Sequence, residues 1–199
     1  MREIYKSIIA GICIGIAGTV YLKVGGLAGA VIFAFGLIAV VSLQLWLFTG
    51  MAYKVWRKHH LQLFVILLLN LLGCLTVASI VSDTEITSAT EAIISQRLTH
   101  GFIQCGLKAI GCGFIMTTAV TQVKKHNNWW PLLFGVPVFI MCGLPHCVAD
   151  AFYLECCSPA FLQTHLAQIL RFYGAIVIGN YLGCNIFRLT IQSKSHETN

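Results

Sequence analysis

A chain of 199 residues, of which 57% are hydrophobic and only 10% are charged, differs from soluble domains, in which about 25% of residues are charged. The mean hydropathy of +0.81 indicates a membrane protein. The formal net charge of +6 does not indicate a nucleic-acid partner, because the basic residues form short clusters at the ends of apolar runs and make no basic stripe with interleaved aromatic residues.

Six apolar runs follow one another along the chain. Runs of about 17–25 residues are long enough to cross a bilayer as helices. The sequence predicts membrane helices at about 7–24, 28–56, 61–81, 98–123, 129–154 and 166–189. A polar, acidic segment at 82–91 follows the third run, and a loop at 155–164 precedes the sixth. The second and fifth runs are too long for one straight crossing, so we expect an interruption in each.

The fifth run contains the segment Cys142-Gly143-Leu144-Pro145-His146. Proline removes a backbone donor and breaks a helix, and glycine weakens one. An ionisable side chain at membrane depth is costly, and by default it indicates a functional site. We therefore expect His146 to lie on a helix break near the middle of the bilayer. The alternative is a histidine that is hydrogen-bonded inside a packed break and has no further role.

The distribution of charge predicts the topology. Six crossings would place both termini on one side of the membrane. Nine of the thirteen basic residues fall on that side, namely Arg2, Lys6, Lys54, Arg57, Lys58, Lys124, Lys125, Arg188 and Lys194. The acidic residues on the other side are Asp83, Glu85, Glu91 and Glu155. Because cytoplasmic loops carry the excess of lysine and arginine, we expect a multi-pass protein of the cell (inner) membrane with both termini cytoplasmic.

The two halves of the sequence resemble each other. Asn70-Leu71-Leu72-Gly73-Cys74 in the third run matches Asn180-Tyr181-Leu182-Gly183-Cys184 in the sixth, and the breaks around Leu47 and His146 lie 99 residues apart. We therefore expect an all-α integral membrane fold of six transmembrane helices. They would form two inverted three-helix repeats with interrupted second and fifth helices, at about 7–82 and 98–190, within one transmembrane channel domain of residues 1–199. Such folds place a substrate site near the bilayer midplane.

Four short stretches match the motifs of a known family. One is the second run from Gly36 to the loop Leu47-Phe48-Thr49-Gly50, and another is Gly143-x-x-His146-x-x-Ala149-Asp150-x-Phe152, which looks like a Gly-x-Glu-His-Ser-x-Ala-Asn-x-Phe signature. The other two are Asn70-x-x-Gly73 and Gly179-Asn180-x-x-Gly183. Together they resemble the formate/nitrite transporter family, which are aquaporin-like pentameric channels for small monovalent anions. The resemblance implies a homopentamer with one pore in each protomer.

The resemblance also implies roles for individual residues. Phe33, Leu37 and Phe139 match positions of apolar constrictions, and Leu47 and Phe48 lie near the inner one. Thr49 matches a loop hydroxyl that faces the central histidine, which is His146. The sequence departs from the family where Trp46 and Pro145 replace acidic residues and Asp150 replaces the signature asparagine. Ile110 aligns with a polar residue of the fourth helix, and Arg97 is the cation nearest to the position of a family lysine.

Several residues keep two interpretations. Lys108, inside the fourth run, could line the pore and attract anions or could form an ion pair with Asp150. Asn70, Asn180 and Asp150 are assigned to bracing the loops, because broken helices leave backbone groups that need partners, and the asparagines could instead contact substrate. The nine cysteines are expected to be small apolar helix residues, although the pair Cys156-Cys157 could be redox-active. No motif predicts a metal site, a cofactor or an enzyme nucleophile.

The function that the sequence favours is passive or proton-linked passage of a small monovalent anion such as formate, nitrite or hydrosulfide. His146 would donate a hydrogen bond or a proton to the anion, because the unperturbed imidazole pKa of about 6.5 lets modest changes in surroundings switch its charge. The chain would act with the lipid bilayer and further copies of itself, and not as an enzyme. Two alternatives stay open: a channel for small neutral solutes with a structural histidine, and a non-transporting membrane scaffold or sensor.

Overall fold

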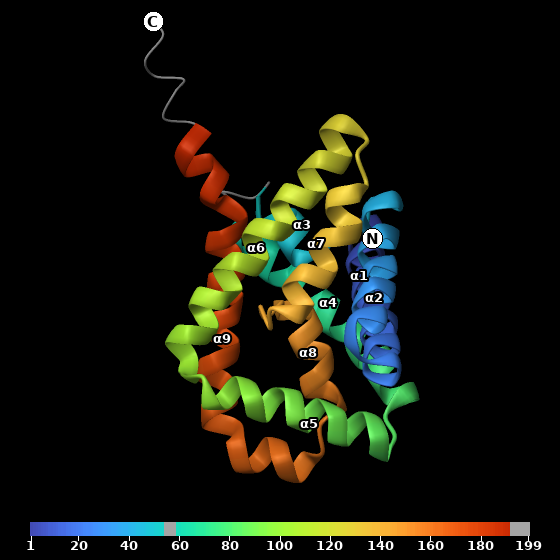
Figure 1. Ribbon diagram of the computed structural model, residues 1–199, viewed down its shortest axis with the longest axis vertical. Coiled ribbons are helices and arrows are strands. Elements are labelled where there is room, and N and C mark those ends of the chain that lie inside the picture. The colour runs from blue at the N-terminus through green and yellow to red at the C-terminus, as the bar shows by residue number, and fades with distance from the viewer. Residues whose placement is uncertain (54–58, 192–199) are drawn as a thin grey trace, which may run out of the picture.

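A computed structural model describes residues 1–53 and 59–191, with side chains up to residue 186. Within these ranges the chain is helical, and Figure 1 shows its helices in order: α1 (Arg2–Val24), α2 (Gly26–Ser42), α3 (Phe48–Ala52), α4 (His60–Val81), α5 (Thr84–Thr99), α6 (Gly101–His126), α7 (Trp130–Met141), α8 (Cys147–Cys156) and α9 (Pro159–Ile191). The basic residues Lys54, Arg57, Lys58 and Lys194 lie outside the described residues, as does the side chain of Arg188.

Four of these helices, α1, α4, α6 and α9, are long and apolar enough to cross a membrane. The shorter helices α2 and α7 are also apolar. Large apolar side chains such as Phe35, Leu68 and Phe134 are exposed on the outside of the bundle at 64%, 48% and 61%. A surface of this kind is stable against lipid tails and would be an aggregation hazard in water. The protein is therefore a multi-pass, all-helical membrane protein.

Both overlong apolar runs are interrupted. The second run stops at Ser42 and resumes as the short helix α3, and the fifth run stops at Met141 and resumes as α8. One residue near the start of each break has a positive φ, which is 53° at Gln44 and 62° at Gly143. A left-handed glycine is ordinary, whereas a left-handed glutamine is uncommon. The two residues lie 99 positions apart, so both helices end with the same backbone turn.

Helices α1 and α4 pack directly against each other, as do α6 and α9. A Cβ atom on Gly73 would overlap the carbonyl oxygen of Ile8, and a Cβ atom on Gly183 would overlap that of Ile110. Glycine at these positions lets the two backbones touch, which is a common mode of helix packing in membranes. Figure 1 shows α6 and α9 on one side of the molecule and α1 and α2 on the other, with α7 and α8 between them.

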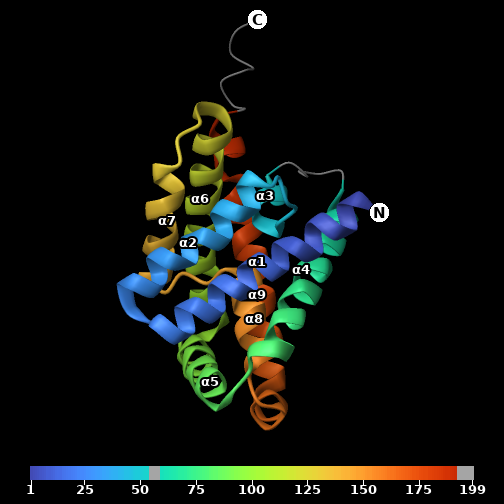
Figure 2. The same ribbon diagram turned by 90° about the vertical axis from the view of Figure 1, so that its right-hand side faces the viewer.

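Two segments differ from the sequence-based expectation. The polar stretch after α4, to which no helix was assigned, forms the first half of α5, and the Asp83 side chain begins this helix by accepting from the backbone N–H of Ile86 (2.8 Å). Aspartate is a favoured residue for this position. The loop expected at 155–164 is wrong, because α8 continues to Cys156 and α9 already begins at Pro159. Figure 1 shows α5 lying across one end of the bundle, and Figure 2 shows the same helix almost end-on.

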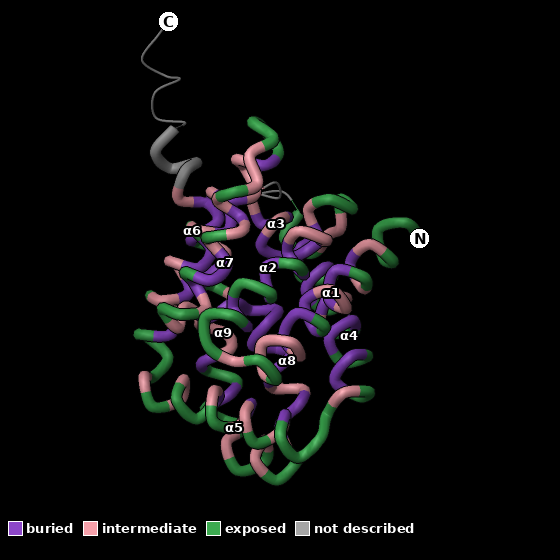
Figure 3. The backbone as a smooth tube through the Cα atoms, turned by 45° about the vertical axis from the view of Figure 1, so that its right-hand side comes forward, coloured by how far each residue is buried: buried purple, intermediate pink, exposed green. Residues whose placement is uncertain are grey.

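The buried residues gather around the breaks. Figure 3 shows the buried backbone in the middle of the molecule near α3 and α8, and exposed or half-buried residues along α5. The buried polar side chains include those of Thr49, Asn70, His146, Asp150 and Asn180, each at most 2% exposed. Buried polar groups need hydrogen-bond partners, so the interior around the breaks is where a polar site is built.

Candidate pore site

His146 is the N-terminal capping residue of α8. Its ring nitrogen Nδ1 accepts from the backbone N–H of Ala149 (3.3 Å), and its own backbone N–H donates to Oδ2 of Asp150 (2.8 Å). The two bonds are reciprocal as in a capping box, except that Asp150 lies one residue after the position that usually returns the second bond. Since Nδ1 accepts a hydrogen bond, the proton of the neutral ring lies on Nε2. The cap therefore fixes both the orientation and the tautomer of the ring.

Thr49 of α3 faces this ring. Its Oγ1 atom lies 3.1 Å from Nε2 of His146, and both side chains are 2% exposed. With the proton on Nε2, His146 donates and the threonine hydroxyl accepts. The two interrupted helices thus meet through one hydrogen bond at the centre of the molecule.

Asn70 of α4 satisfies the first break. Its Oδ1 atom accepts from the backbone N–H of Phe48 (2.9 Å). Its amide nitrogen donates to the carbonyl oxygens of Ser7 (2.8 Å) and Trp46 (2.9 Å). One fully buried side chain therefore joins the first break to α1 and satisfies the backbone groups that the break leaves free.

Asn180 of α9 makes the corresponding contacts at the second break. Its Oδ1 atom accepts from the backbone N–H of Cys147 (2.8 Å). Its amide nitrogen donates to the carbonyl oxygens of Ala109 (2.9 Å) and Pro145 (3.0 Å). Cys147 and Pro145 lie 99 residues after the two partners of Asn70 in the first break, so both breaks are held in the same way.

Two cysteines extend this correspondence across the molecule. The thiol of Cys74 on α4 contacts the carbonyl oxygen of Val148 in α8 (3.6 Å), and the thiol of Cys184 on α9 contacts that of Thr49 in α3 (3.4 Å). Each long helix thus holds the half-helix of the other half of the chain.

Cys157 belongs to the pair for which a redox role was considered. It is a buried thiol, and burial raises its pKa to about 11, so it is a poor nucleophile at neutral pH.

Apolar side chains pack around the His146–Thr49 pair. The residues assigned to constrictions from the sequence are all at most 3% exposed, namely Phe33, Leu37, Leu47, Phe48 and Phe139. The ring of Phe139 stacks on the imidazole of His146 (centroids 5.9 Å apart) and meets Phe33 edge to face (6.2 Å). The polar pair therefore lies in apolar surroundings with little room for water.

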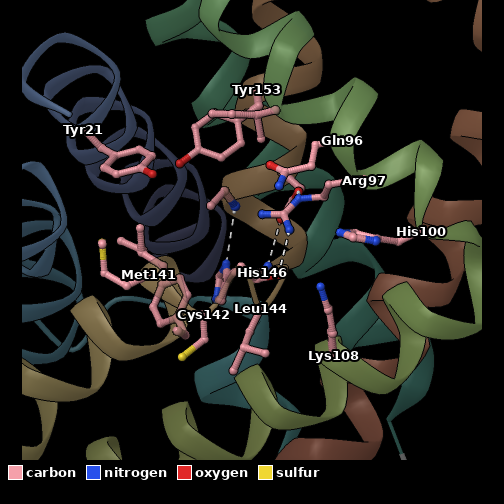
Figure 4. A pocket seen from close by; sticks show the side chains of 16 residues that line it. Tyr21, Gln96, Arg97, His100, Lys108, Met141, Cys142, Leu144, His146 and Tyr153 are labelled. Carbon is pink, nitrogen blue, oxygen red and sulfur yellow. Dashed lines mark hydrogen bonds and ion pairs between the residues drawn. The ribbon is translucent and has the colours of Figure 1, made fainter. Parts of the chain in front are cut away.

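A cavity of about 210 Å³ lies on the α5 side of this pair. Figure 4 shows its side chains, with Arg97, His100 and Lys108 together on one side of the view and His146 near the middle. The residues with full charges among its described lining are Arg97, Lys108 and Asp150. Lys108 thus lies in the cavity, as its pore-lining interpretation requires. Ile110 instead lines a groove between α6 and α9 and is not among the residues of this cavity.

The partner of Asp150 is Arg97 and not Lys108, so of the two interpretations of Lys108 the ion pair with Asp150 is wrong. The Nε atom of Arg97 forms an ion pair with Oδ1 of Asp150, and its Nη1 atom donates to the carbonyl oxygen of Gly143 (3.0 Å). The reason is α5, which brings Arg97 over the second break. Because no helix was expected in this segment, the contact between Arg97 and Asp150 could not be predicted from the sequence.

Other cavities lie at the opposite end of the pair. One of about 130 Å³ is lined by Thr49 together with Thr117 and Thr121 of α6, and it extends to Lys124 and Lys125. A second, of about 490 Å³, is lined by residues that include Lys6, Gln44, Trp46, Lys124 and Trp129. His146 thus borders a cavity on one side and Thr49 borders a cavity on the other, with their hydrogen bond between.

A buried polar pair at the junction of two broken helices, bordered by cavities on both sides, defines a membrane transport protein. The sequence profile of the formate/nitrite transporter family matches residues 1–193, and the chain belongs to this family. Its members are channels and transporters and not enzymes. Among curated protein sequences no significant match is found.

Two solved structures share the fold. A pentameric formate channel with formate bound superposes with a TM-score of 0.80 at 19% identity, over 99% of this chain and 97% of that chain. An FNT family ion channel superposes with a TM-score of 0.78 at 20% identity, over 98% of this chain and 90% of the other. At these identities the similarity establishes the fold.

Proposed function

We propose that this protein is a channel or transporter for small monovalent anions of the formate, nitrite or hydrosulfide type, with His146 as the central hydrogen-bond donor. The observation that carries the proposal is the buried His146–Thr49 pair between cavities on its two sides. Family membership and the fold of a formate channel support the class of substrate. The small volume of the cavity next to His146, about 210 Å³, favours an anion of a few atoms.

We further propose six membrane crossings in two inverted repeats, at about 7–82 and 98–190. The matching contacts of Asn70 and Asn180, and the matching turns at Gln44 and Gly143, support this arrangement. Both termini would be cytoplasmic in the cell (inner) membrane. The lysines at the end of α6 and the acidic residues that begin α5, at opposite ends of the bundle, support this orientation.

The cavity of about 210 Å³ next to His146, which we call the outer cavity, would be the first to bind the anion. Lys108 borders it and would attract a negative charge, since a cleft with low-dielectric walls focuses the field of its charges. Removing water from a bare anion is costly, so the anion needs a replacement donor before it passes the rings of Phe33 and Phe139. Nε2 of His146 would supply this donor when the anion displaces the hydroxyl of Thr49.

The capping role of His146 favours donation of a hydrogen bond over transfer of a proton. An imidazolium would carry a proton on Nδ1, where it would face the N–H of Ala149 and break the cap of α8. It would also place a charge in a buried apolar region. The neutral ring with its proton on Nε2 retains both the cap and the donor.

Flux into liposomes tests the proposal. Purified protein in phosphatidylcholine vesicles is expected to pass formate and nitrite at pH values between about 5 and 8, the range around the unperturbed pKa of histidine. Absence of anion flux at every pH, with glycerol or water passing, would reject the anion channel in favour of the neutral-solute channel. The replacement of acidic residues by Trp46 and Pro145 motivates that alternative.

The role of the central pair needs its own variants. We expect His146→Phe to lower anion flux at every pH, because the variant lacks the Nε2–H donor, while the oligomer still forms. Thr49→Val removes the hydroxyl at nearly constant volume and should lower flux, whereas Thr49→Ser keeps the hydroxyl and serves as the matched control. Equal flux from the valine and serine variants would show that the hydroxyl has no part in transport.

We propose a homopentamer as the assembly, because the formate channel with the same fold is pentameric. The mass of the detergent-solubilised protein, corrected for bound detergent by light scattering, tests it. A mass of five chains is expected, and a monomer would overturn the assignment.

A further inference from the structure

Arg97 connects a surface helix to the central histidine. It lies in the last turn of α5, and its guanidinium contacts two residues of the second break, the carboxylate of Asp150 and the carbonyl oxygen of Gly143. Figure 4 shows Arg97 reaching from α5 towards the end of the cavity at which His146 lies. The side chain is 16% exposed, so it lies at the cavity wall and not on the outer surface.

Asp150 links Arg97 to His146, because it contacts both residues. One of its carboxylate oxygens faces Arg97, and the other accepts from the backbone N–H of His146 (2.8 Å). Asp150 is fully buried. A buried carboxylate is stable only with a compensating charge and hydrogen bonds, so Asp150 depends on Arg97, and the position of the His146 backbone depends on Asp150.

The same ion pair determines the charge of the cavity. Arg97, Lys108 and Asp150 are the fully charged members of its described lining. Arg97 and Asp150 neutralise each other by direct contact, which leaves the charge of Lys108. A neutral asparagine at position 150 would leave two positive charges in the same small space.

We propose that Arg97 is a positioning and specificity-determining residue: its ion pair with Asp150 holds the backbone of His146 and limits the outer cavity to a net charge of one. The inference rests on the proposed anion-channel function. It explains why an aspartate can replace a neutral residue beside the central histidine without repelling anions. It also assigns α5 a part in the pore, since this helix supplies the guanidinium.

A double-mutant cycle tests the inference. Asp150→Asn keeps an oxygen acceptor for the N–H of His146 but releases Arg97, Arg97→Gln leaves the carboxylate without a counter-ion, and the double variant contains neither charge. Formate flux into phosphatidylcholine liposomes gives KM and maximal rate for each variant, at low salt and at about 0.15 M salt, where the Debye length is about 8 Å. Arg171→Gln is the control, since it removes a cation from the groove between α6 and α9, outside this cavity.

The expected pattern follows from the charges. Asp150→Asn lowers the KM for formate by about three-fold or more at low salt, and the effect shrinks at higher salt because the added charge is screened. Arg97→Gln raises KM and lowers the thermal stability of the assembly. The double variant has a KM within about two-fold of the parent and unfolds within a few degrees of it. The two substitutions are not additive because the two charges act on each other. The control differs little from the parent.

Two results would overturn the inference. One is a folded Asp150→Asn protein whose KM equals that of the parent at low salt, and the other is a double variant whose defects are the sum of the single ones. A purely structural ion pair predicts loss of stability without the salt-dependent change in KM. Failure of the parent protein to pass any anion would instead reject the proposed function, so the two failures are distinguishable.

Discussion

The Nε2 atom of His146 lies 3.1 Å from the Oγ1 atom of Thr49, and this hydrogen bond joins the two broken helices at their breaks. Asparagines on α4 and α9 satisfy the backbone groups next to these residues, so the imidazole and the hydroxyl are left to interact with each other. Each of the two also borders a cavity. The pair is thus the polar link between both ends of the molecule.

Substitutions of His146 should separate its capping role from its role as a donor. Asparagine is a good helix cap, so His146→Asn keeps an acceptor for the N–H of Ala149 and should unfold at nearly the parental temperature. Its shorter side chain does not reach Thr49, so formate flux should fall. His146→Ala loses both functions and should cost about 1–2 kcal/mol of stability. Thermal unfolding and liposome flux measure the two effects, and parental flux in the asparagine variant would contradict the donor role.

Asn70 and Asn180, which brace the two breaks, should contribute equally to the stability of the protein. Asn70→Ala and Asn180→Ala each remove three hydrogen bonds from buried backbone groups. Buried groups left without partners cost about 1–3 kcal/mol each before the site relaxes, so each variant should lose about 2–4 kcal/mol in total. Chemical unfolding in detergent gives the value. If one variant were much less destabilised than the other, the two breaks would not be held in the same way.

The sequence predicted the breaks because their signals are local. Pro145 and Gly143 interrupt an apolar run, and the first break, which contains no proline, was expected because its apolar run is too long for one crossing and pairs with the other overlong run. The sequence did not predict α5, because its buried face, which consists of Ile86, Thr90 and Ile94, is narrow and lies within a mostly polar stretch. Polar contacts add to this burial, such as the carboxylate of Glu91 accepting from the backbone N–H (3.0 Å) and hydroxyl (2.6 Å) of Ser158.

The ion pair of Asp150 is a second feature that could not be predicted from the sequence. From the sequence, an ion pair with Asp150 was one of two interpretations of Lys108, which lies within an apolar run, and no such pair was assigned to Arg97. Spacing along the chain does not tell which of two cations reaches a buried carboxylate when one is carried by an unexpected helix. The contact between Arg97 and Asp150 spans 53 residues and requires the three-dimensional arrangement of α5 over the second break.

The close packing of the long helices predicts the effect of adding single methyl groups. Gly73→Ala and Gly183→Ala would force α1 from α4 and α6 from α9, and each should cost about 1–3 kcal/mol, as overpacked cores do. Gly174→Ala on the same helix as Gly183 is the control, since its added Cβ meets nothing within 4 Å. That variant should be neutral or more stable by about 0.5–1 kcal/mol. Thermal unfolding compares the three, and a harmless Gly183→Ala would contradict the packing.

The N-terminus of α5 should lose stability in acid. The hydrogen bond from the backbone N–H of Ile86, and then the Lys23 side chain, lower the pKa of Asp83 below its ordinary value of 3.8. A lowered pKa means that the ionised group stabilises the helix above the ordinary pKa, and that this contribution is lost as the pH falls through the folded value. The protection of the first amides of α5 against hydrogen exchange, relative to the intrinsic exchange rate at each pH, should therefore fall below about pH 3.8. Asp83→Ala should show the faster exchange at neutral pH and no further acid step.

Cys142 offers a test of which end of the pore is outside. It is exposed and lines the same cavity as His146 and Lys108, whereas Cys147, a few residues away, is fully buried. A charged thiol reagent that does not cross membranes should label Cys142 when added outside intact cells and should reduce formate flux. Cys142→Ala should abolish both the labelling and the inhibition, which separates this site from the other cysteines. With both termini cytoplasmic, the cavity opens outward, so labelling only from the cytoplasmic side of inverted vesicles would reverse the proposed orientation while leaving the site itself unchanged.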